Sequence, residues 1–166
     1  MFLTITGGTK TQRMAVESIA QYSGAKLMSP RLYPKIEVDI ELSSKLFKQD
    51  NVIGDIIWED RNHKPRWFTM RVDTGVSKRR MLETIAHEMV HIAQFATGRL
   101  VELDRTRYHR WEGKVYKKQP DYWDRPWEIE AHGRECGLFL QWVEENNLQD
   151  QAWTWDDLDK YKQAYE

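Results

Sequence analysis

Cysteine is almost absent from this sequence of 166 residues, since Cys136 is its one thiol. A single cysteine cannot form a disulfide within the chain, which favours a reducing compartment, and we expect the protein to be cytoplasmic. No run of about eighteen apolar residues occurs, so the sequence predicts no membrane-spanning helix and no membrane partner. The few apolar residues before Gly7 are too short a run for a secretory signal.

An excess of charge of one sign is also missing, because 25 basic residues nearly balance 26 acidic ones. The molecule as a whole therefore has no strong field that would attract nucleic acid or a membrane, although local patches remain open. Eight tryptophans and a hydrophobic content of 40% indicate a globular protein. The length suits one folded unit, so we expect residues 1–166 to form a single domain.

Hydrophobic periodicity predicts both helices and strands in this chain. Helices are expected over residues 11–22, 77–97, 126–146 and 154–165, and strands over residues 35–42, 51–60 and 66–74. Thr11 is the expected N-cap of the first helix, and the last two strands are expected to form a hairpin. Residues 99–124 are aromatic, charged and poorly periodic, which predicts an irregular segment with a small hairpin around Gly113.

The segment HEMVH, residues 87 to 91, places two histidines four apart on a predicted helix. An α-helix turns by about 100° per residue, so His87 and His91 project from one shared face, off the apolar stripe. Two imidazoles at this spacing can bind one tetrahedral zinc ion, while Glu88 stays off the metal but close to a bound water. Because the pattern fixes only three positions, a chance match on a surface helix is the alternative interpretation.

The third zinc ligand has to come from elsewhere, since a catalytic zinc ion usually has three protein ligands and one water. The metzincin pattern is excluded, because Gln94 and Thr97 stand where it requires a glycine and a third histidine. Glu128 lies at the centre of the apolar arc of the predicted 126–146 helix, where an uncompensated carboxylate is costly. Zinc would neutralise Glu128, and a buried salt bridge to an arginine is the alternative.

Other residues of the same helix remain candidates. Glu130 falls on the predicted solvated side, which makes it the weaker carboxylate ligand. His132 and Glu135 share the inward face with Glu128 and can accept the second ring N–H of a ligating histidine. His132 can instead be the third ligand itself, or an ordinary hydrogen-bonded histidine of the core.

HEMVH on one helix and EIEAH on a later one resemble the two-part signature of the gluzincin branch of the zincin metallopeptidases. That resemblance implies Glu128 as a ligand and an aspartate where this sequence has His132. The short chain and the aromatic loop also resemble the small SprT-like metallopeptidase domains of bacteria and phages, which implies a histidine ligand and keeps His132 open. Both resemblances, over roughly residues 66–140, imply an α+β zincin-like fold, with a small antiparallel sheet packed against the HExxH helix and a second metal-binding helix.

The sequence therefore predicts a zinc-dependent metalloendopeptidase that acts on peptides or proteins. Zinc would lower the pKa of a bound water and polarise the scissile carbonyl, and Glu88 is the expected general base. The segment RWFTMRVD before the motif is expected to bind an extended peptide at a sheet edge. The candidate donors to the oxyanion are Tyr108, His109, Tyr116 and Tyr122.

Two other functions remain open at this point. The basic and aromatic segment 105–118 can follow a phosphate backbone and stack bases, and the SprT-like resemblance implies DNA-linked proteins as a possible substrate class. A solvated loop whose aromatic residues cover the core is the plain alternative for this segment. Zinc can also be structural, without catalysis, and Glu88 distinguishes the two because a structural pair of histidines needs no acid there.

Overall fold

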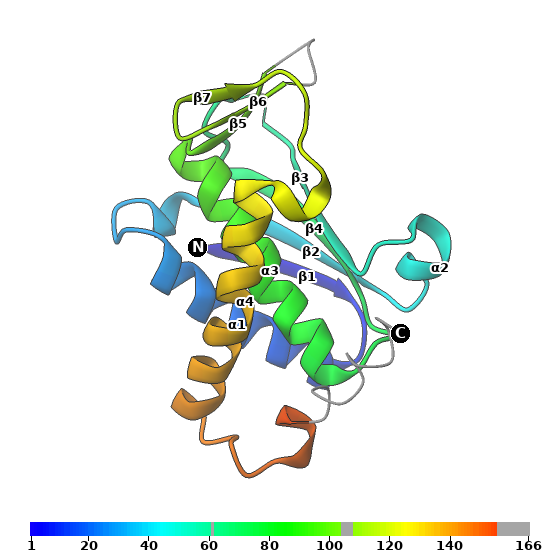
Figure 1. The fold of residues 1–166 in the computed structure, drawn as a ribbon. Helices are drawn as coiled ribbons and strands as arrows, with labels where there is room; N and C mark the ends of the chain where they lie inside the picture. The colour runs from blue at the N-terminus through cyan, green and yellow to red at the C-terminus, as the bar shows by residue number, and fades with distance from the viewer. Residues whose placement is uncertain (61, 104–107, 156–166) are drawn as a thin grey trace.

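The structure is a computed structural model that describes residues 1–60, 62–103 and 108–155. Figure 1 shows an α+β fold, as expected from the sequence. In chain order its elements are β1 (Phe2–Gly7), α1 (Lys10–Leu27), η1 (Tyr33–Lys35), β2 (Glu37–Ser43), α2 (Leu46–Asp50), β3 (Gly54–Trp58), β4 (Trp67–Asp73), α3 (Lys78–Thr97), β5 (Leu100–Leu103), β6 (Tyr108–Trp111), β7 (Lys114–Tyr116), η2 (Tyr122–Asp124), α4 (Pro126–Glu145) and η3 (Ala152–Thr154).

The larger sheet is mixed, so the expectation of an antiparallel sheet is wrong for most of its strands. Its order is β1-β2-β4-β3, with β1, β2 and β4 parallel and β3 antiparallel to β4. The β3–β4 hairpin is confirmed. The parallel pairs escaped prediction because alternating apolar residues indicate a half-buried strand but not its direction.

The segment RWFTMRVD is not at a sheet edge. It forms β4, which pairs with β2 on one side and with β3 on the other. The expected edge pairing at this segment is therefore wrong, because its backbone hydrogen-bonding groups already have partners. Among the described strands of this sheet, β3 and β1 occupy the two edges.

Helix α1 begins earlier and ends later than the sequence predicts. Its N-cap is Thr9 and not Thr11: the Thr9 hydroxyl accepts from the Gln12 backbone N–H, and the Gln12 side chain accepts from the Thr9 N–H. This reciprocal pair is a capping box. The helix continues past the predicted end at residue 22 to Leu27, and Gly24 is buried inside it.

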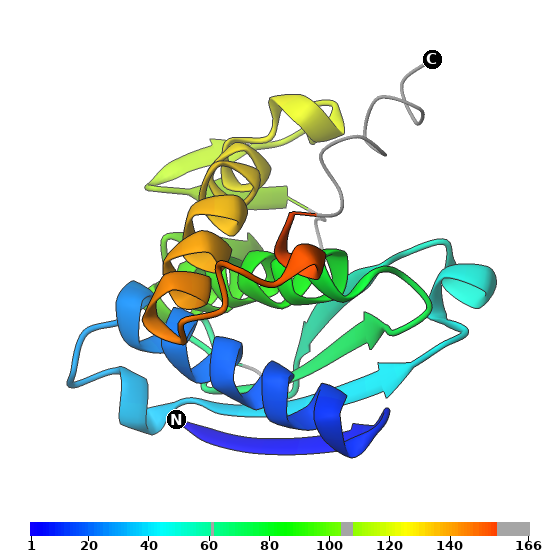
Figure 2. The same cartoon turned by 90° about the horizontal axis from the view of Figure 1, so that it is seen from below.

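Helices α1 and α3 lie on the same side of the larger sheet, and α4 packs against α3 (Figure 2). Helix α3 agrees with the helix predicted over residues 77–97: Ser77 is its N-cap, and Gly98 ends it in the left-handed conformation. Every residue of α3 from Met81 to Ala96 is buried, so the helix that carries HEMVH runs through the core. None of the described helices is long and apolar enough to cross a membrane.

A second, antiparallel sheet follows α3, where the sequence predicts an irregular segment. Its order is β5-β6-β7, and the expected hairpin is confirmed at Glu112 and Gly113, which both have positive φ. His109, Trp111 and Tyr116 gather around Trp127 of α4, with ring centroids 5.2, 6.4 and 5.7 Å away. The helix expected over residues 154–165 lies almost entirely outside the described residues.

Candidate metal centre

His87 and His91 lie one turn apart on α3, and their rings point to the same place. The two Nε2 atoms are 3.1 Å apart, and the ring centroids are 4.8 Å apart in an edge-on arrangement. Both side chains are buried. The shared face predicted from the four-residue spacing is therefore present, although it faces the interior of the protein and not its surface.

Glu128 reaches the same point from the first turn of α4. Its Oε2 lies 3.3 Å from Nε2 of His91 and 3.6 Å from Nε2 of His87. The carboxylate is buried, as the periodicity of the helix predicts, and both of its ion-pair partners among the described residues are histidines. The alternative of a buried salt bridge to an arginine is therefore wrong. The three residues expected as metal ligands come together.

The opposite nitrogen of each ring is hydrogen-bonded to an acceptor. Nδ1 of His87 lies 2.7 Å from a carboxylate oxygen of Glu135, and Nδ1 of His91 lies 2.8 Å from Oε1 of Gln94. The amide group of Gln94 is held in this orientation because its Nε2 donates a hydrogen bond to the Trp127 carbonyl at 3.0 Å. Both Nδ1 atoms therefore donate, and each neutral ring presents a lone pair at Nε2.

With both rings neutral, three lone pairs would face one another without a hydrogen between them. Oε2 of Glu128 is buried and has no hydrogen-bond partner. Such an arrangement requires positive charge, either as protons or as a cation. Without a metal the protons take this role: burial alone would lower the pKa of His87, but Glu128 and Glu135 raise this pKa to about 9. Burial would raise the pKa of Glu128, yet the neighbouring imidazoles of His87 and His91 hold this pKa below its ordinary value.

The donor set can hold a divalent metal ion. His87, His91 and Glu128 form a group whose ligand atoms all lie within 4.8 Å of one another. Two imidazole nitrogens and one carboxylate oxygen are ligands that zinc takes in catalytic sites, with a fourth position left for water. The orphaned Glu128 oxygen and the two oriented rings are the features of this structure that fit a bound ion.

Glu88 lies beside the three donors and outside their group. It is buried, which raises the pKa of its carboxyl; the negative charges of Glu128 and Asp55 also raise this pKa, and the two histidines oppose the rise. Strand β3 approaches closely here, because a Cβ added at Gly54 would lie 3.2 Å from Oε1 of Glu88 and would clash with Thr84. A carboxyl group with a raised pKa is suited to accept and release protons near neutral pH.

His132 belongs to a second, overlapping group with His87 and Glu135. Its Nδ1 lies 3.3 Å from the Glu135 carboxylate, and its Nε2 lies 3.1 Å from the hydroxyl of Tyr122. The acceptor role expected for Glu135 is therefore present, as its oxygen accepts from His87 and contacts His132. His132 faces Tyr122 and Glu135, whereas Glu128 is the carboxylate that contacts both motif histidines among the described residues. The geometry therefore favours Glu128 as the third ligand.

Tyr122 stands out among the four candidates for an oxyanion donor. It precedes α4 in the short helix η2, and it lines both cavities beside the histidines. Burial and the charge of Glu128 raise the pKa of Tyr122, so its hydroxyl keeps its proton. His109 and Tyr116 instead pack their rings on Trp127.

The histidines open into a cleft made of two adjoining cavities of about 390 and 470 Å³. The two cavities share Val52, Gly54, His87, Glu88 and Tyr122. The candidate metal centre therefore lies in the middle of the cleft, and a chain lying in the cleft would pass over it. Strand β3 forms one wall, and the segment from β5 to the start of α4 forms the other.

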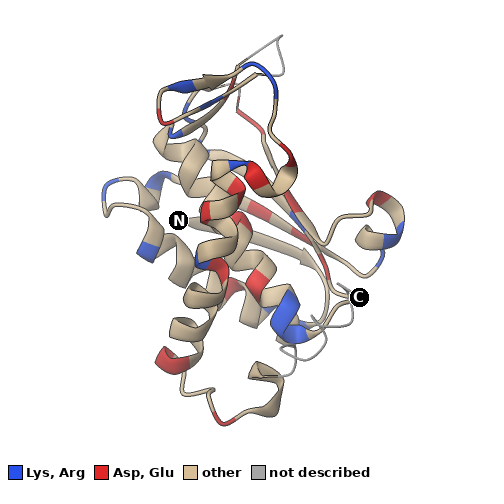
Figure 3. Ribbon diagram, viewed as in Figure 1, with Lys and Arg blue, Asp and Glu red and all other residues tan. Residues whose placement is uncertain are grey.

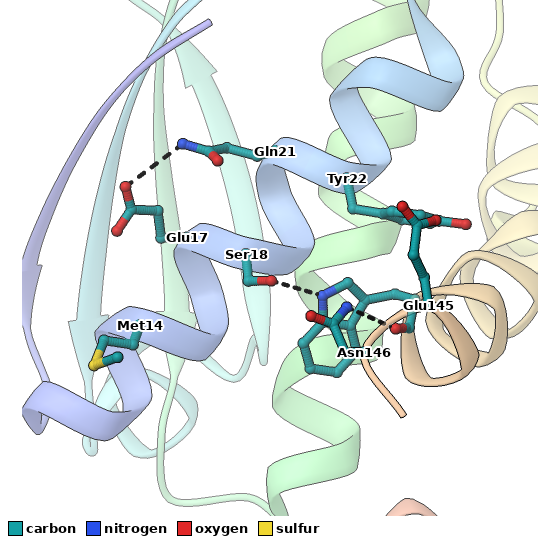
Figure 4. Close-up of a pocket in the computed structure, with 8 residues that line it drawn as sticks. Met14, Glu17, Ser18, Gln21, Tyr22, Glu145 and Asn146 are labelled. Carbon is teal, nitrogen blue, oxygen red and sulfur yellow. Dashed lines mark hydrogen bonds between the residues drawn. The ribbon is translucent and has the colours of Figure 1, made fainter. Parts of the chain in front are cut away.

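Another hollow, of about 520 Å³, lies between α1 and the end of α4 (Figure 4). Its lining includes Met14, Glu17 and Tyr22, and Trp142 there donates a hydrogen bond to Ser18 at 2.9 Å. The residues that line it include no histidine, cysteine or aspartate. We therefore place the candidate functional site in the cleft and not here.

Acidic residues gather on the first turns of α4 (Figure 3). Glu130, expected on the solvated side, is instead half-buried and pairs with Arg99 and Arg134 at 3.0 Å each. Burial would raise the pKa of Glu130, but its hydrogen bonds to Arg99 and Gln94 lower it. This arrangement differs from the expectation because the second sheet covers a helix face that periodicity alone assigns to solvent.

Gln94, which stands where the metzincin pattern requires a glycine, orients His91 and so belongs to the site, a role that the sequence did not assign to it. Its position three residues after His91, on the same helix face, is the signal that would have identified it.

Comparisons with protein families, with curated proteins and with solved structures found no match to this chain.

Proposed function

We propose that this protein is a zinc-dependent metalloendopeptidase with His87, His91 and Glu128 as metal ligands and Glu88 as general base. One observation carries the proposal: two oriented imidazoles and a buried carboxylate without a hydrogen-bond partner converge on one point, beside a second buried carboxyl group. This point lies inside an open cleft, which a structural zinc site does not need.

The protein side chains have separate roles in the proposed reaction. Zinc, when bound, would lower the pKa of a water molecule and polarise the scissile carbonyl. Glu88 takes the proton of the attacking water and passes it to the leaving amine, which its raised pKa favours. Tyr122, whose hydroxyl stays protonated, donates to the oxygen that becomes negative. Glu135 and Gln94 hold the two histidine rings in the ligating tautomer.

The substrate would bind along β3 instead of along the segment first expected. Strand β3 is an edge of the mixed sheet, and its residues Gly54, Asp55 and Ile56 line the cleft beside Glu88. An extended peptide can add to such an edge through backbone hydrogen bonds. The side chain missing at Gly54 lets this strand approach Glu88, so a peptide on β3 would lie close to the proposed base.

Replacing Glu88 tests the proposal directly. Glu88→Gln keeps the size of the side chain but cannot accept the proton, so we expect hydrolysis of a casein or peptide substrate to fall at least about a hundredfold. Bound zinc, measured by elemental analysis, should stay at one ion per chain. Glu144→Gln, exposed on the last turns of α4, is the control and should retain full activity.

Two outcomes would contradict this assignment. Retained hydrolysis in Glu88→Gln would exclude Glu88 as the base. Loss of zinc and of the folded state together in this variant would favour a structural metal, because Glu88 would then support the site and not the reaction. Zinc-loaded wild-type protein without any hydrolysis of unfolded substrates would exclude the peptidase.

A nucleic-acid role for segment 105–118 receives less support. Residues 105–107 lie outside the described residues. In the described part Trp111 is buried, and Tyr116 packs edge-on against Trp127, so neither ring is presented for base stacking. Arg110, Lys114, Lys117 and Lys118 remain as a basic contribution. A nucleic-acid role requires salt-sensitive binding of single-stranded DNA that is lost when Arg107, Arg110 and Lys117 are neutralised, and salt-insensitive non-binding would exclude it.

A further inference from the structure

We propose that the cleft selects a basic side chain of the substrate, a lysine or an arginine, through Glu102. This inference rests on the proposed peptidase function and names its substrate class. The selected residue would lie within a few positions of the scissile bond, because Glu102 lines the same cavity as His87, His91 and Glu88.

Glu102 extends from the wall of the cleft formed by the second sheet. It lies two residues beyond Leu100 in β5, so both side chains are on the same face of the strand. Leu100, Trp58 and Phe95 line this cavity as well, and the Trp58 and Phe95 rings lie 4.6 Å apart. The cavity therefore has an apolar lining, formed by Leu100, Trp58 and Phe95, together with the carboxylate of Glu102.

The charge of Glu102 has no cationic partner within ion-pair distance among the described residues. Arg99, which directly precedes the same strand, pairs with Glu112 and Glu130 instead. The cavity has one other acidic residue away from the metal centre, Asp55, and this is neutralised by Arg71. Glu102 is thus the carboxylate of the cleft that a ligand can still neutralise.

The arginine that lines the cavity does not cancel this charge. Arg125 donates to the Pro120 carbonyl at 3.2 Å and lies over the ring of Tyr122, at 5.5 Å from its centroid. Its guanidinium is therefore held beside η2, while Glu102 extends from β5. Among the described residues, the cleft therefore has its positive charge beside η2 and a carboxylate without a cationic partner on β5.

A lysine or arginine side chain matches both features. Its methylene groups can lie on the rings of Trp58 and Phe95, while its charged end reaches the carboxylate of Glu102. An acidic side chain would leave two like charges together in a partly enclosed cavity, which is unfavourable. An apolar side chain of equal length would make the ring contacts but would leave Glu102 without a partner.

A series of peptides that differ at one position measures the selection. Lysine, arginine, norleucine or glutamate is placed in turn at each of three positions on either side of the cleaved bond in a fluorogenic peptide. At one of these positions we expect kcat/KM for lysine or arginine to exceed that for norleucine about tenfold, because a charge-assisted contact is gained. Glutamate should be the poorest substrate there.

Variants of Glu102 assign the preference to this residue. Glu102→Gln should bring the ratio of lysine to norleucine peptides to about one, and Glu102→Lys should make glutamate the preferred residue. Glu41→Gln, exposed on β2 outside the cleft, should keep the wild-type ratio. A lysine preference that persists in Glu102→Gln, or hydrolysis by the wild type without any preference, would overturn the inference.

Equilibrium binding separates this inference from the peptidase proposal. The same peptides are titrated into zinc-loaded Glu88→Gln protein, and tryptophan fluorescence reports binding. Tighter binding of the lysine peptide, lost in the Glu88→Gln/Glu102→Gln double variant, supports the basic subsite even if the wild type proves unable to hydrolyse peptides. Equal binding of lysine and norleucine peptides overturns it, whatever the outcome for hydrolysis.

Discussion

Removing Glu128 should weaken zinc binding far more than removing His132. Glu128 contributes one of the three converging donor atoms and the one negative charge of the proposed ligand set. His132 faces the hydroxyl of Tyr122 and the carboxylate of Glu135, and within the described residues it has no hydrogen bond or ion pair with Glu128 or His91. Alanine at each position separates the two candidates for the third ligand.

The size of the effect follows from the number of ligands. Zinc bound by four protein ligands in small domains contributes about 10–16 kcal/mol, or roughly 3 kcal/mol for each ligand. Losing one ligand therefore predicts a zinc affinity about a hundredfold weaker for Glu128→Ala, since about 1.4 kcal/mol corresponds to a factor of ten. For His132→Ala we expect a change of less than about tenfold, because the 2.7 Å hydrogen bond between Glu135 and His87 remains.

Competition with a fluorescent chelator measures both affinities, and elemental analysis after dialysis gives the stoichiometry. Glu130→Ala is the matched control, since Glu130 lies on the same helix and pairs with Arg99 and Arg134 instead of the histidines. If His132→Ala loses its zinc while Glu128→Ala keeps it, the assignment of Glu128 is refuted and the histidine-completed site is correct. Circular dichroism of each apo variant verifies that the fold is retained.

Two further predictions concern the base and the protonation of the site. Gly54→Ala should lower the free energy of unfolding by about 1–3 kcal/mol, because the new Cβ would clash with Thr84. It should also reduce kcat, because this Cβ lies close to the carboxyl group of Glu88. Unchanged urea unfolding together with unchanged activity would contradict this prediction. Zinc affinity should rise about tenfold per pH unit from about pH 7 and level off near pH 9, because the metal must displace the proton that the raised pKa of about 9 keeps on His87. An affinity independent of pH between these limits, measured by chelator competition, would show that His87 is already neutral.

Much of the site could be predicted from the sequence, because helix geometry is local. The four-residue spacing of His87 and His91 fixes their common face wherever the helix packs. Glu128 could be selected over Glu130 because an acid in the middle of an apolar arc is costly without a partner. Glu135 could be predicted to accept a hydrogen bond from a ligating histidine, because it shares the inward face of its helix with Glu128.

The rest depended on tertiary packing that periodicity does not encode. The burial of α3 on all sides was not evident, because polar residues such as Thr84 and Gln94 are buried there through hydrogen bonds. Strand β1 was not predicted, since two residues facing inward in a six-residue strand are a weak signal. The edge position of β3 required the strand order, which in turn depends on the parallel pairing of β2 with β4.

The two helices that supply the proposed metal ligands differ in how deeply they are buried. Both imidazoles come from the deeply buried middle of α3, whereas the carboxylate comes from the opening turn of α4, where Ile129 is exposed to solvent. A bound ion would thus cross-link a rigid element to a more peripheral one. Substitutions that shift α4 by a fraction of an ångström, even far from the cleft, would then tune metal retention while leaving the histidine pair intact.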